Sequence, residues 1–457
     1  MLALLAILPL CPTQSVSIHL SPPAAESVAS GAHFRVTAHF DDDKIAAEAL
    51  AAAEAAWSWT VDLFGAPQID EAKPLEVHLY RTIADYEAAE EPLTHGAYKR
   101  NLAFTSHETG AAYIALQPDV SDSVLKRIGL PLLTRQLIAH EAVHVIVGRA
   151  WQNHRTLPLW LKEGSATWIC EQAMKKQGWI QSAMDDPMNA ASAVRVRRLE
   201  ADKKLPSLSA VFDDLLGELE FNDRYSVWQV TFAYLGQEKQ SGALTRILAG
   251  ARQMGGGETH AASVADLARA ELSSGGDLAA RDRELTAFVR ALAPRWDEVH
   301  RSLDTHDDTF VQAAFTTSNA ICWRTEDVGV ARYEISGELE IFPGNSHQQN
   351  LLLARTRNGF VQVAFTADYG VDVFEYDNRR LGSAQWKRLG TAKVDTVVAG
   401  KTIEFRVRVS KSKLSVEVTG KRACEVDTGD HAMQGAYGLG AVAGSAGTWR
   451  KVQLKKS

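Results

Sequence analysis

The chain is poor in cysteine, which limits both its fold class and its chemistry. It has 4 cysteines among 457 residues, too few for a framework of disulfides. Cys322 and Cys424 lie in the same C-terminal region and could pair if the protein is exported. Cys170 lies in an apolar stretch and is more typical of a small core residue than of a nucleophile. The cysteines therefore predict neither a disulfide-rich fold nor thiol chemistry.

The chain also lacks an excess of positive charge and a long apolar segment. It has 49 Lys and Arg against 56 Asp and Glu, a net charge of −7, and no long basic block. These numbers give no electrostatic case for binding nucleic acid. The apolar run at 2–10 is too short to span a bilayer but suits a secretory signal peptide.

We therefore expect residues 1–15 to be an export signal, cleaved near Ser15, and the protein to be secreted or periplasmic without a transmembrane span. No Lys or Arg precedes the apolar run, so a buried N-terminal strand remains an alternative. A lipid anchor on Cys11 has little support, because Leu10 rather than a small residue precedes it.

No internal repeat or low-complexity linker divides the chain, but its length and periodicity do. A chain of 457 residues exceeds what one hydrophobic core usually serves. Apolar residues mostly follow a helical period up to about residue 301 and a period of two from about residue 305. We predict a multidomain α+β protein, with a small sheet and a helical lobe at 30–303 and an antiparallel β-sandwich at 308–457.

The N-terminal domain is expected to begin with strands and to continue with helices. An alanine-rich helix at 44–64 is ended by Gly65, and Pro131 stands near the start of another helix. Strands are expected at 32–40, 75–80 and 112–117, and further helices at 132–150, 163–175, 207–219, 223–237, 242–254 and 282–302.

The C-terminal region alternates between apolar and polar residues, as a half-buried strand does. Ile403, Phe405 and Val407 alternate with charged residues, and a second alternating run follows a polar turn, which predicts a hairpin. Many short strands, Gly-rich turns and the absence of a helical pattern predict a sandwich. Other strands are expected at 332–342, 349–356, 360–366, 371–376 and 438–443.

Residues 140–144 read His-Glu-Ala-Val-His, an HExxH motif inside a helical run. Histidines four positions apart lie on one face of a helix, where both can bind one metal ion. Glu141 points away from that face and is placed to take a proton from water rather than to bind the metal. Glu163 follows His144 by 19 residues and can supply an oxygen ligand. The set His140, His144 and Glu163 predicts one Zn²⁺, which cobalt or manganese could replace in vitro.

Chance and a solvated helix surface are the two alternatives to a zinc site. HExxH also occurs by accident, and a surface helix can carry solvated His and Glu. The surface alternative is weakened because both histidines share a helix side with Leu133 and Leu137, which indicates that they face the protein. Buried ionisable groups need partners, and a metal ion supplies one.

The segment Trp160-Leu161-Lys162-Glu163-Gly164-Ser165-Ala166 and the HExxH motif resemble the gluzincin metallopeptidases, specifically the peptidase-MA-like domains, over about residues 30–300. In that family a W-L-x-E-G-x-A segment carries the glutamate ligand. The resemblance implies that His140, His144 and Glu163 bind zinc. It also implies that Glu141 is the catalytic carboxylate in hydrolysis of a peptide or protein substrate.

The residue that stabilises the oxyanion is predicted with less support from the sequence. Tyr225 lies 62 positions after Glu163, close to the spacing of the tyrosine that related aminopeptidases use. A core aromatic in an apolar helix is the competing interpretation. Tyr234 and His154 are weaker candidates for the same role.

No Gly-x-Met-Glu-Asn stretch, which recognises a free amine in the zinc aminopeptidases, is found in the chain. Exopeptidase character therefore has no support, and endopeptidase is the default expectation. The strand at 111–117 is a candidate edge for pairing with an extended peptide.

The glycine-rich segments 435–440 and 444–449 resemble the end of concanavalin-A-like jelly-roll domains. The resemblance implies a module that binds glycans or acts as a spacer. Trp323, Trp386 and Trp449 could stack on sugars, although buried tryptophans are commoner in such folds. Asp372 and Glu375 are most simply charges on a solvated face. The alternative functions are thus an inactive peptidase-like protein that binds glycan or envelope, and amide hydrolysis in cell-wall peptides.

Overall fold

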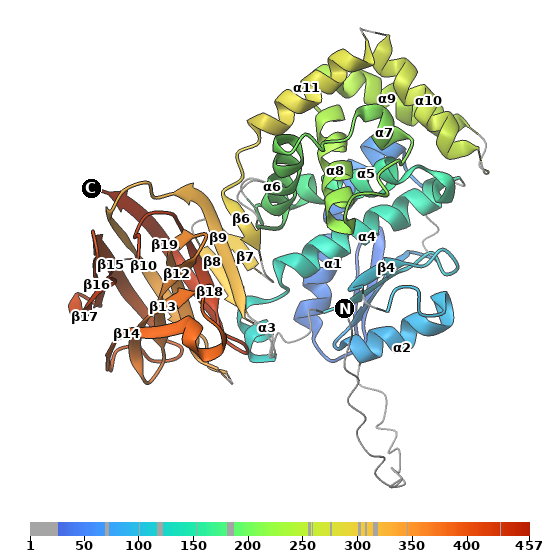
Figure 1. The fold of residues 1–457 in the computed structure, drawn as a ribbon. Coiled ribbons are helices and arrows are strands. Elements are labelled where there is room, and N and C mark those ends of the chain that lie inside the picture. The colour runs from blue at the N-terminus through green and yellow to red at the C-terminus, as the bar shows by residue number, and fades with distance from the viewer. Residues whose placement is uncertain are drawn as a thin grey trace, which may run out of the picture.

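The computed structural model describes residues 26–457 apart from 69–72, 100, 117–121, 152, 181–186, 255–256, 258, 275–276, 300–302, 307–308, 314–318, 345 and 430. The expected signal at 1–15, with Cys11 and Ser15, lies outside these residues. No helix within the described ranges is long and apolar enough to cross a membrane. Figure 1 shows a part built of a small sheet and many helices beside a β-sandwich, so the coarse fold class is the predicted one.

The N-terminal part contains a five-stranded mixed sheet with the order β1-β2-β3-β5-β4. Strands β2, β3 and β5 are parallel, whereas β1 and β4 pair antiparallel with their neighbours. The strand predicted at 32–40 corresponds to β2, and the strand that precedes it and pairs with it, β1, was not predicted. The strands are β1 (Ser27–Ser30), β2 (Phe34–Ala38), β3 (Leu75–Tyr80), β4 (Ala103–Thr105) and β5 (Ala112–Ala115).

Helices cover both faces of this sheet. Helix α1 (Asp43–Phe64) begins at Asp42, whose side chain accepts a hydrogen bond from the Ile45 amide, and ends at Gly65 as predicted. Its buried alanines let α4 (Leu132–Ala150) pack closely against it on the inner face of the sheet. Helix α2 (Ile83–Thr94) lies on the other face, where Tyr86 packs against Tyr80.

The helical lobe follows the pattern of the sequence in its main elements. Helix α4 has the predicted bounds, whereas α5 begins four residues before the predicted start at 163. The helix predicted at 282–302 is wrong after Ala291, because Pro294 cannot continue it and the chain turns into a strand. The remaining helices are α3 (Asp122–Ile128), α5 (Leu159–Lys176), α6 (Pro187–Ala201), α7 (Leu208–Phe212), α8 (Phe221–Leu235), α9 (Glu238–Gln253), α10 (His260–Ser273) and α11 (Leu278–Ala291), with the short 3-10 turn η1 (His154–Thr156) before α5.

Two seven-stranded antiparallel sheets form the sandwich, with the orders β17-β16-β15-β10-β19-β8-β7 and β14-β13-β12-β11-β18-β9-β6. The predicted alternation holds in β15, where every second side chain is buried. The strands are β6 (Trp296–Val299), β7 (Leu303–His306), β8 (Thr309–Ala313), β9 (Ala320–Asp327), β10 (Arg332–Ile341), β11 (Gln348–Thr356), β12 (Gly359–Thr366), β13 (Gly370–Asp377), β14 (Trp386–Ala392), β15 (Thr402–Ser410), β16 (Lys413–Val418), β17 (Lys421–Asp427), β18 (Ala436–Ala441) and β19 (Ala446–Lys456), with the 3-10 turn η2 (Gly382–Gln385) before β14.

The disulfide considered for Cys322 and Cys424 is not formed by these two described residues. Cys322 is buried in β9, and Cys424 lies in β17 of the opposite sheet. Strand β17 contacts β14, which is at the far end of its sheet from β9. The two cysteines are therefore separated by the width of the sandwich.

The sandwich packs directly on the helical part (Figure 1). Helix α6 contacts β6, and Ala190 of α6 is fully buried within the core of the sandwich. In the other direction, Phe342 and Ala446 of the sandwich belong to the core of the helical part. Arg127 of α3 forms an ion pair with the buried Glu340 of β10. The two parts therefore share their apolar cores at the junction.

Candidate metal centre

Helix α4 presents the two motif histidines on its one partly open face. On the opposite side of the helix, Ile138, Ala142 and Ile146 are fully covered by the sheet and α1. The His140 and His144 side chains keep 17% and 15% of their surface exposed. The two side chains are therefore accessible to a ligand, while the backbone of the helix is held by its buried faces.

Helix α5 brings the third candidate ligand to the same place. It begins after Pro158 and carries Glu163 in its second turn, with a side chain 12% exposed. The next residue is Gly164, at the point where α8 crosses α5. A side chain does not fit there, because a Cβ added at Gly164 would lie 2.6 Å from the Trp228 carbonyl oxygen. The Glu-Gly pair of the sequence thus combines a ligand with the close helix contact that holds it.

The three ligand atoms lie in a compact triangle. The Nε2 atoms of His140 and His144 are 3.1 Å apart, and each lies 3.4 Å from Oε2 of Glu163. Two ligands of a tetrahedral zinc ion, with bonds of about 2.0–2.1 Å, lie about 3.3–3.5 Å apart. These three residues form the one group of His, Cys, Asp and Glu in the described part of the chain that is spaced to hold a metal ion. The donor set and its spacing fit zinc.

Glu163 and His144 of the triad shift each other's pKa values. Burial alone would raise the pKa of Glu163, but the nearby rings of His144 and His140 hold that pKa well below its usual range. Burial alone would lower the pKa of His144, but the carboxylate of Glu163 raises it by more, so the net shift of the His144 pKa is upward. The site therefore holds a carboxylate that stays ionised between two imidazoles, the arrangement in which a divalent ion is well compensated.

Glu141 lies outside the triad and is held by the sheet. Its side chain is 7% exposed, and the hydroxyl of Thr105 in β4 donates a hydrogen bond of 2.6 Å to its Oε2 atom. The same hydroxyl lies 3.3 Å from the Glu141 carbonyl oxygen. The structure thus separates the metal-binding face of α4 from the carboxylate predicted to move protons.

Tyr225 of α8 reaches the triad from the helical lobe. Its hydroxyl donates a hydrogen bond of 3.2 Å to Oε2 of Glu163. Burial and the carboxylates of Glu163 and Glu141 raise the pKa of Tyr225, so the hydroxyl stays a donor. Tyr225 is therefore part of the centre and not only a core aromatic, although its catalytic role stays a prediction.

The two weaker candidates have different surroundings. The hydroxyl of Tyr234 donates to Glu284 of α11 at 3.0 Å, within the helical lobe and outside the triad. His154 packs beside the metal face of α4, next to Gly148. Thr105, His107 and Tyr98 were not predicted as site residues. Strand β4 has only three residues, too few for a periodic signal in the sequence.

The strand proposed as the edge for an extended peptide is not an edge. Strand β5, within 111–117, lies between β3 and β4 and pairs with both. Strand β4 is at the end of the sheet. The prediction was wrong because a strand as short as β4 leaves no periodic pattern in the sequence, and β4 is the strand that also contacts Glu141.

The tryptophans of the sandwich differ in exposure. Trp449 is fully buried and Trp323 is 4% exposed, so both are core residues. Trp386 of β14 is 42% exposed. Asp372 and Glu375 of β13 pair with basic neighbours: Asp372 with Arg388 at 3.6 Å, and Glu375 with His431 at 3.6 Å.

The sequence matches no family model and no curated protein. Three similar solved structures are a carbohydrate-binding module, CBM66, from Bacillus subtilis, the exoplasmic/lumenal domain of VIP36 and the carbohydrate recognition domain of Emp46p. CBM66 is 8% identical over 35% of this chain and 95% of its own, with a TM-score of 0.31. VIP36 is 14% identical over 36% and 87%, and Emp46p 10% over 36% and 88%, each with a TM-score of 0.30. Likeness at this level carries no argument about function.

Proposed function

We propose that this protein is a zinc-dependent peptidase that uses His140, His144 and Glu163 as ligands, and that it belongs with the gluzincins. The observation that carries the proposal is the triangle of 3.1, 3.4 and 3.4 Å among the three ligand atoms. Glu141 follows the ligand His140 in the sequence, and the hydroxyl of Thr105 holds its carboxylate. It supplies the base that peptide hydrolysis needs. A site that only stored metal would not need this carboxylate.

Each residue then has one task. Zinc, when bound, supplies a Lewis acid that polarises the scissile carbonyl and acidifies a water molecule. Glu141 accepts the proton of that water and later gives it to the departing amine. The hydroxyl of Tyr225, which donates to Glu163 at 3.2 Å, is the donor assigned to the oxygen on which negative charge develops. The nearly buried surroundings strengthen both interactions.

The test is the zinc content of the purified full chain, together with cleavage of a mixed peptide library. We expect about one zinc per chain in the wild type and a loss of both zinc and cleavage in Glu163→Ala. Glu171→Ala is the matched control, because Glu171 is on the same helix and contacts Lys175 at 2.6 Å instead of the triad. A wild type without zinc, or zinc retained in Glu163→Ala, would reject the ligand set.

Carbohydrate binding by the sandwich is a second candidate function. Trp386 is 42% exposed, and its ring centroid lies 4.9 Å from that of Tyr376, which lies 5.0 Å from that of Phe360. The Phe360 and Trp386 ring centroids are also 5.8 Å apart, so the three rings form a cluster from which the exposed Trp386 offers an apolar face to a sugar. A glycan array with the wild type, Trp386→Ala and the control Tyr369→Ala tests it. Binding lost only in Trp386→Ala supports it, and absence of wild-type binding rejects it.

A further inference from the structure

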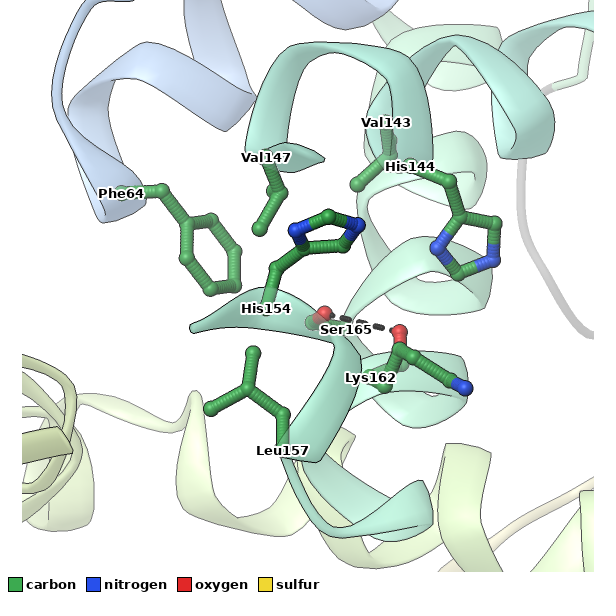
Figure 2. A pocket seen from close by; sticks show the side chains of 8 residues that line it. All are labelled: Phe64, Val143, His144, Val147, His154, Leu157, Lys162 and Ser165. Carbon is green, nitrogen blue, oxygen red and sulfur yellow. Dashed lines mark hydrogen bonds between the residues drawn. The ribbon is translucent and has the colours of Figure 1, made fainter. Parts of the chain in front are cut away.

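The metal-binding face of α4 continues one turn beyond His144, at Gly148. A Cβ added at Gly148 would lie 3.2 Å from Nε2 of His154, so the imidazole of His154 packs directly on the helix there. Figure 2 shows His154 between Phe64 and His144, above Lys162. The side chain that follows the two ligands along this face therefore comes from η1, the turn between the motif helix and the glutamate helix.

His154 begins a chain of contacts that leads away from the metal centre. Its Nε2 atom lies 3.1 Å from Nδ1 of His107, in the loop after β4. The guanidinium of Arg155 donates a hydrogen bond of 2.7 Å to the carbonyl oxygen of His107. This bond fixes the direction of a side chain that is otherwise exposed.

Two neighbouring cavities connect these residues with the metal centre. The smaller, of about 70 Å³, is lined by His144, His154 and Gly148 and also by His107. The larger, of about 510 Å³, is lined by Arg155, Tyr98 and Glu108. Thr105, Ser106 and His107 line both. A ligand in the larger cavity thus lies next to the hydroxyl that holds Glu141.

A cation, Arg155, and a carboxylate, Glu108, both lie on the wall of the larger cavity. Among the described residues no carboxylate forms an ion pair with Arg155, and its guanidinium donates a hydrogen bond to a neutral carbonyl. Glu108 lines the same cavity but is exposed and is not paired with Arg155. Lys162 lines a separate small cavity with His144 and His154, and its amino group lies 3.7 Å from Glu163. Burial, with the charges of His154 and Arg155, lowers the pKa of His107 to about 4.

We propose that Arg155, with His107 and His154 beside it, forms a carboxylate-binding subsite, so that the preferred peptides carry a carboxylate close to the bond that is cleaved. The inference rests on the proposed function and names the substrate class of that site. The guanidinium is a planar donor that binds a carboxylate through two hydrogen bonds. The carboxylate comes from an Asp or Glu side chain or from the C-terminus of the peptide.

The experiment uses the zinc-loaded full chain and a quenched fluorescent peptide library. Its members are matched sets with Glu, Gln or Lys at each position near the cleaved bond, each made with a free and with an amidated C-terminus. We expect wild-type kcat/KM to favour the carboxylate member by about tenfold, less at high salt. Arg155→Ala should remove the preference, Arg155→Glu should shift it to Lys, and the control Arg283→Ala, an exposed residue of α11, should keep it.

The two sources of carboxylate give different results. A preference for Glu over Gln identifies a side chain, and a preference for the free acid over the amide identifies the C-terminus. Cleavage without either preference, or a preference that survives Arg155→Ala, overturns the subsite while leaving the peptidase proposal intact. If no peptide is cleaved, the peptidase proposal fails on its own. Calorimetric binding of the same peptides to the zinc-loaded wild type then decides the subsite, and equal affinities reject it.

Discussion

The carboxylate of Glu141 lies between α4 and the end strand of the sheet, and both contribute to its position. The helix fixes its backbone, and the hydroxyl of Thr105 fixes one of its oxygens at 2.6 Å. A carboxylate held this way has few alternative rotamers. Orientation of this kind lowers the entropy lost when the proton is transferred.

Glu141→Gln separates proton transfer from metal binding. Because Glu141 does not belong to the triad, the variant should keep about one zinc per chain. It should lose kcat by roughly 10²–10⁴-fold, the range for removal of a general base. Metal analysis and steady-state kinetics on the same preparation check both. Loss of zinc in the variant would mean that Glu141 is a ligand.

Thr105→Val removes the hydroxyl that orients Glu141 at nearly constant volume. We expect kcat to fall by about tenfold, the equivalent of losing about 1.5 kcal/mol for a hydrogen bond to a charged group, with KM and zinc content unchanged. Thr105→Ser keeps the hydroxyl and should restore kcat. If Thr105→Ser is as impaired as Thr105→Val, the residue acts through packing and not by positioning Glu141.

Pairs of helices, and not single side chains, decide whether the triad forms. Helix α5 carries Glu163 and packs against α8, which carries Tyr225. At their crossing the backbone of α8 comes so close to Gly164 that no side chain fits without a shift. The distance between α5 and α8 therefore sets the hydrogen bond between Tyr225 and Glu163.

Gly164→Ala tests this coupling. The added Cβ would lie 2.6 Å from the Trp228 carbonyl oxygen, so the helices must separate, and we expect a loss of about 1–3 kcal/mol in stability. Zinc affinity should fall with it. Gly242→Ala in α9 is the control, since its Cβ meets only the far end of Arg246 at 3.5 Å. The control should be as stable as the wild type or slightly more stable, by about 1 kcal/mol at most. Thermal unfolding of both variants decides.

The elements that create the triad could be predicted from the sequence, whereas its neighbours could not. The spacing of His140 and His144 and the Glu-Gly pair are local signals, and the structure brings the three side chains together. Thr105 meets Glu141 across 36 positions, through a strand of three residues that has no periodicity. His107 meets His154 across 47 positions. Contacts of this kind depend on how the sheet and helices are packed, which no pattern in one segment records.

At the scale of the whole molecule, the junction between the helical part and the sandwich is a packed core with a charged pair at its rim. Arg127 pairs with Glu340, which is 5% exposed, and its guanidinium lies 4.8 Å from the centre of the Phe342 ring. Arg450 lies 3.7 Å from the same carboxylate. Removing one of the two cationic partners of a buried carboxylate destabilises the folded protein.

Arg127→Ala should therefore weaken the junction and not only the surface. We expect a loss of about 1–3 kcal/mol and, in calorimetry, the separation of one unfolding transition into two. Arg406→Ala is the control, because Arg406 forms exposed ion pairs with Glu334 and Glu417 on the outside of the sandwich. Such pairs contribute about 0–1 kcal/mol. A single transition that is unchanged in Arg127→Ala would contradict the expectation.

The interleaved junction also constrains how this chain can change over evolution. A module joined by a flexible linker can be exchanged by recombination, because its surface is complete on its own. Here Ala190 fills the core of the sandwich, and Phe342 and Ala446 fill the core of the helical part. A recombinant that received either part alone would inherit an uncovered apolar face, which favours aggregation. The two parts are thus expected to be inherited together and to accumulate compensating substitutions at their junction.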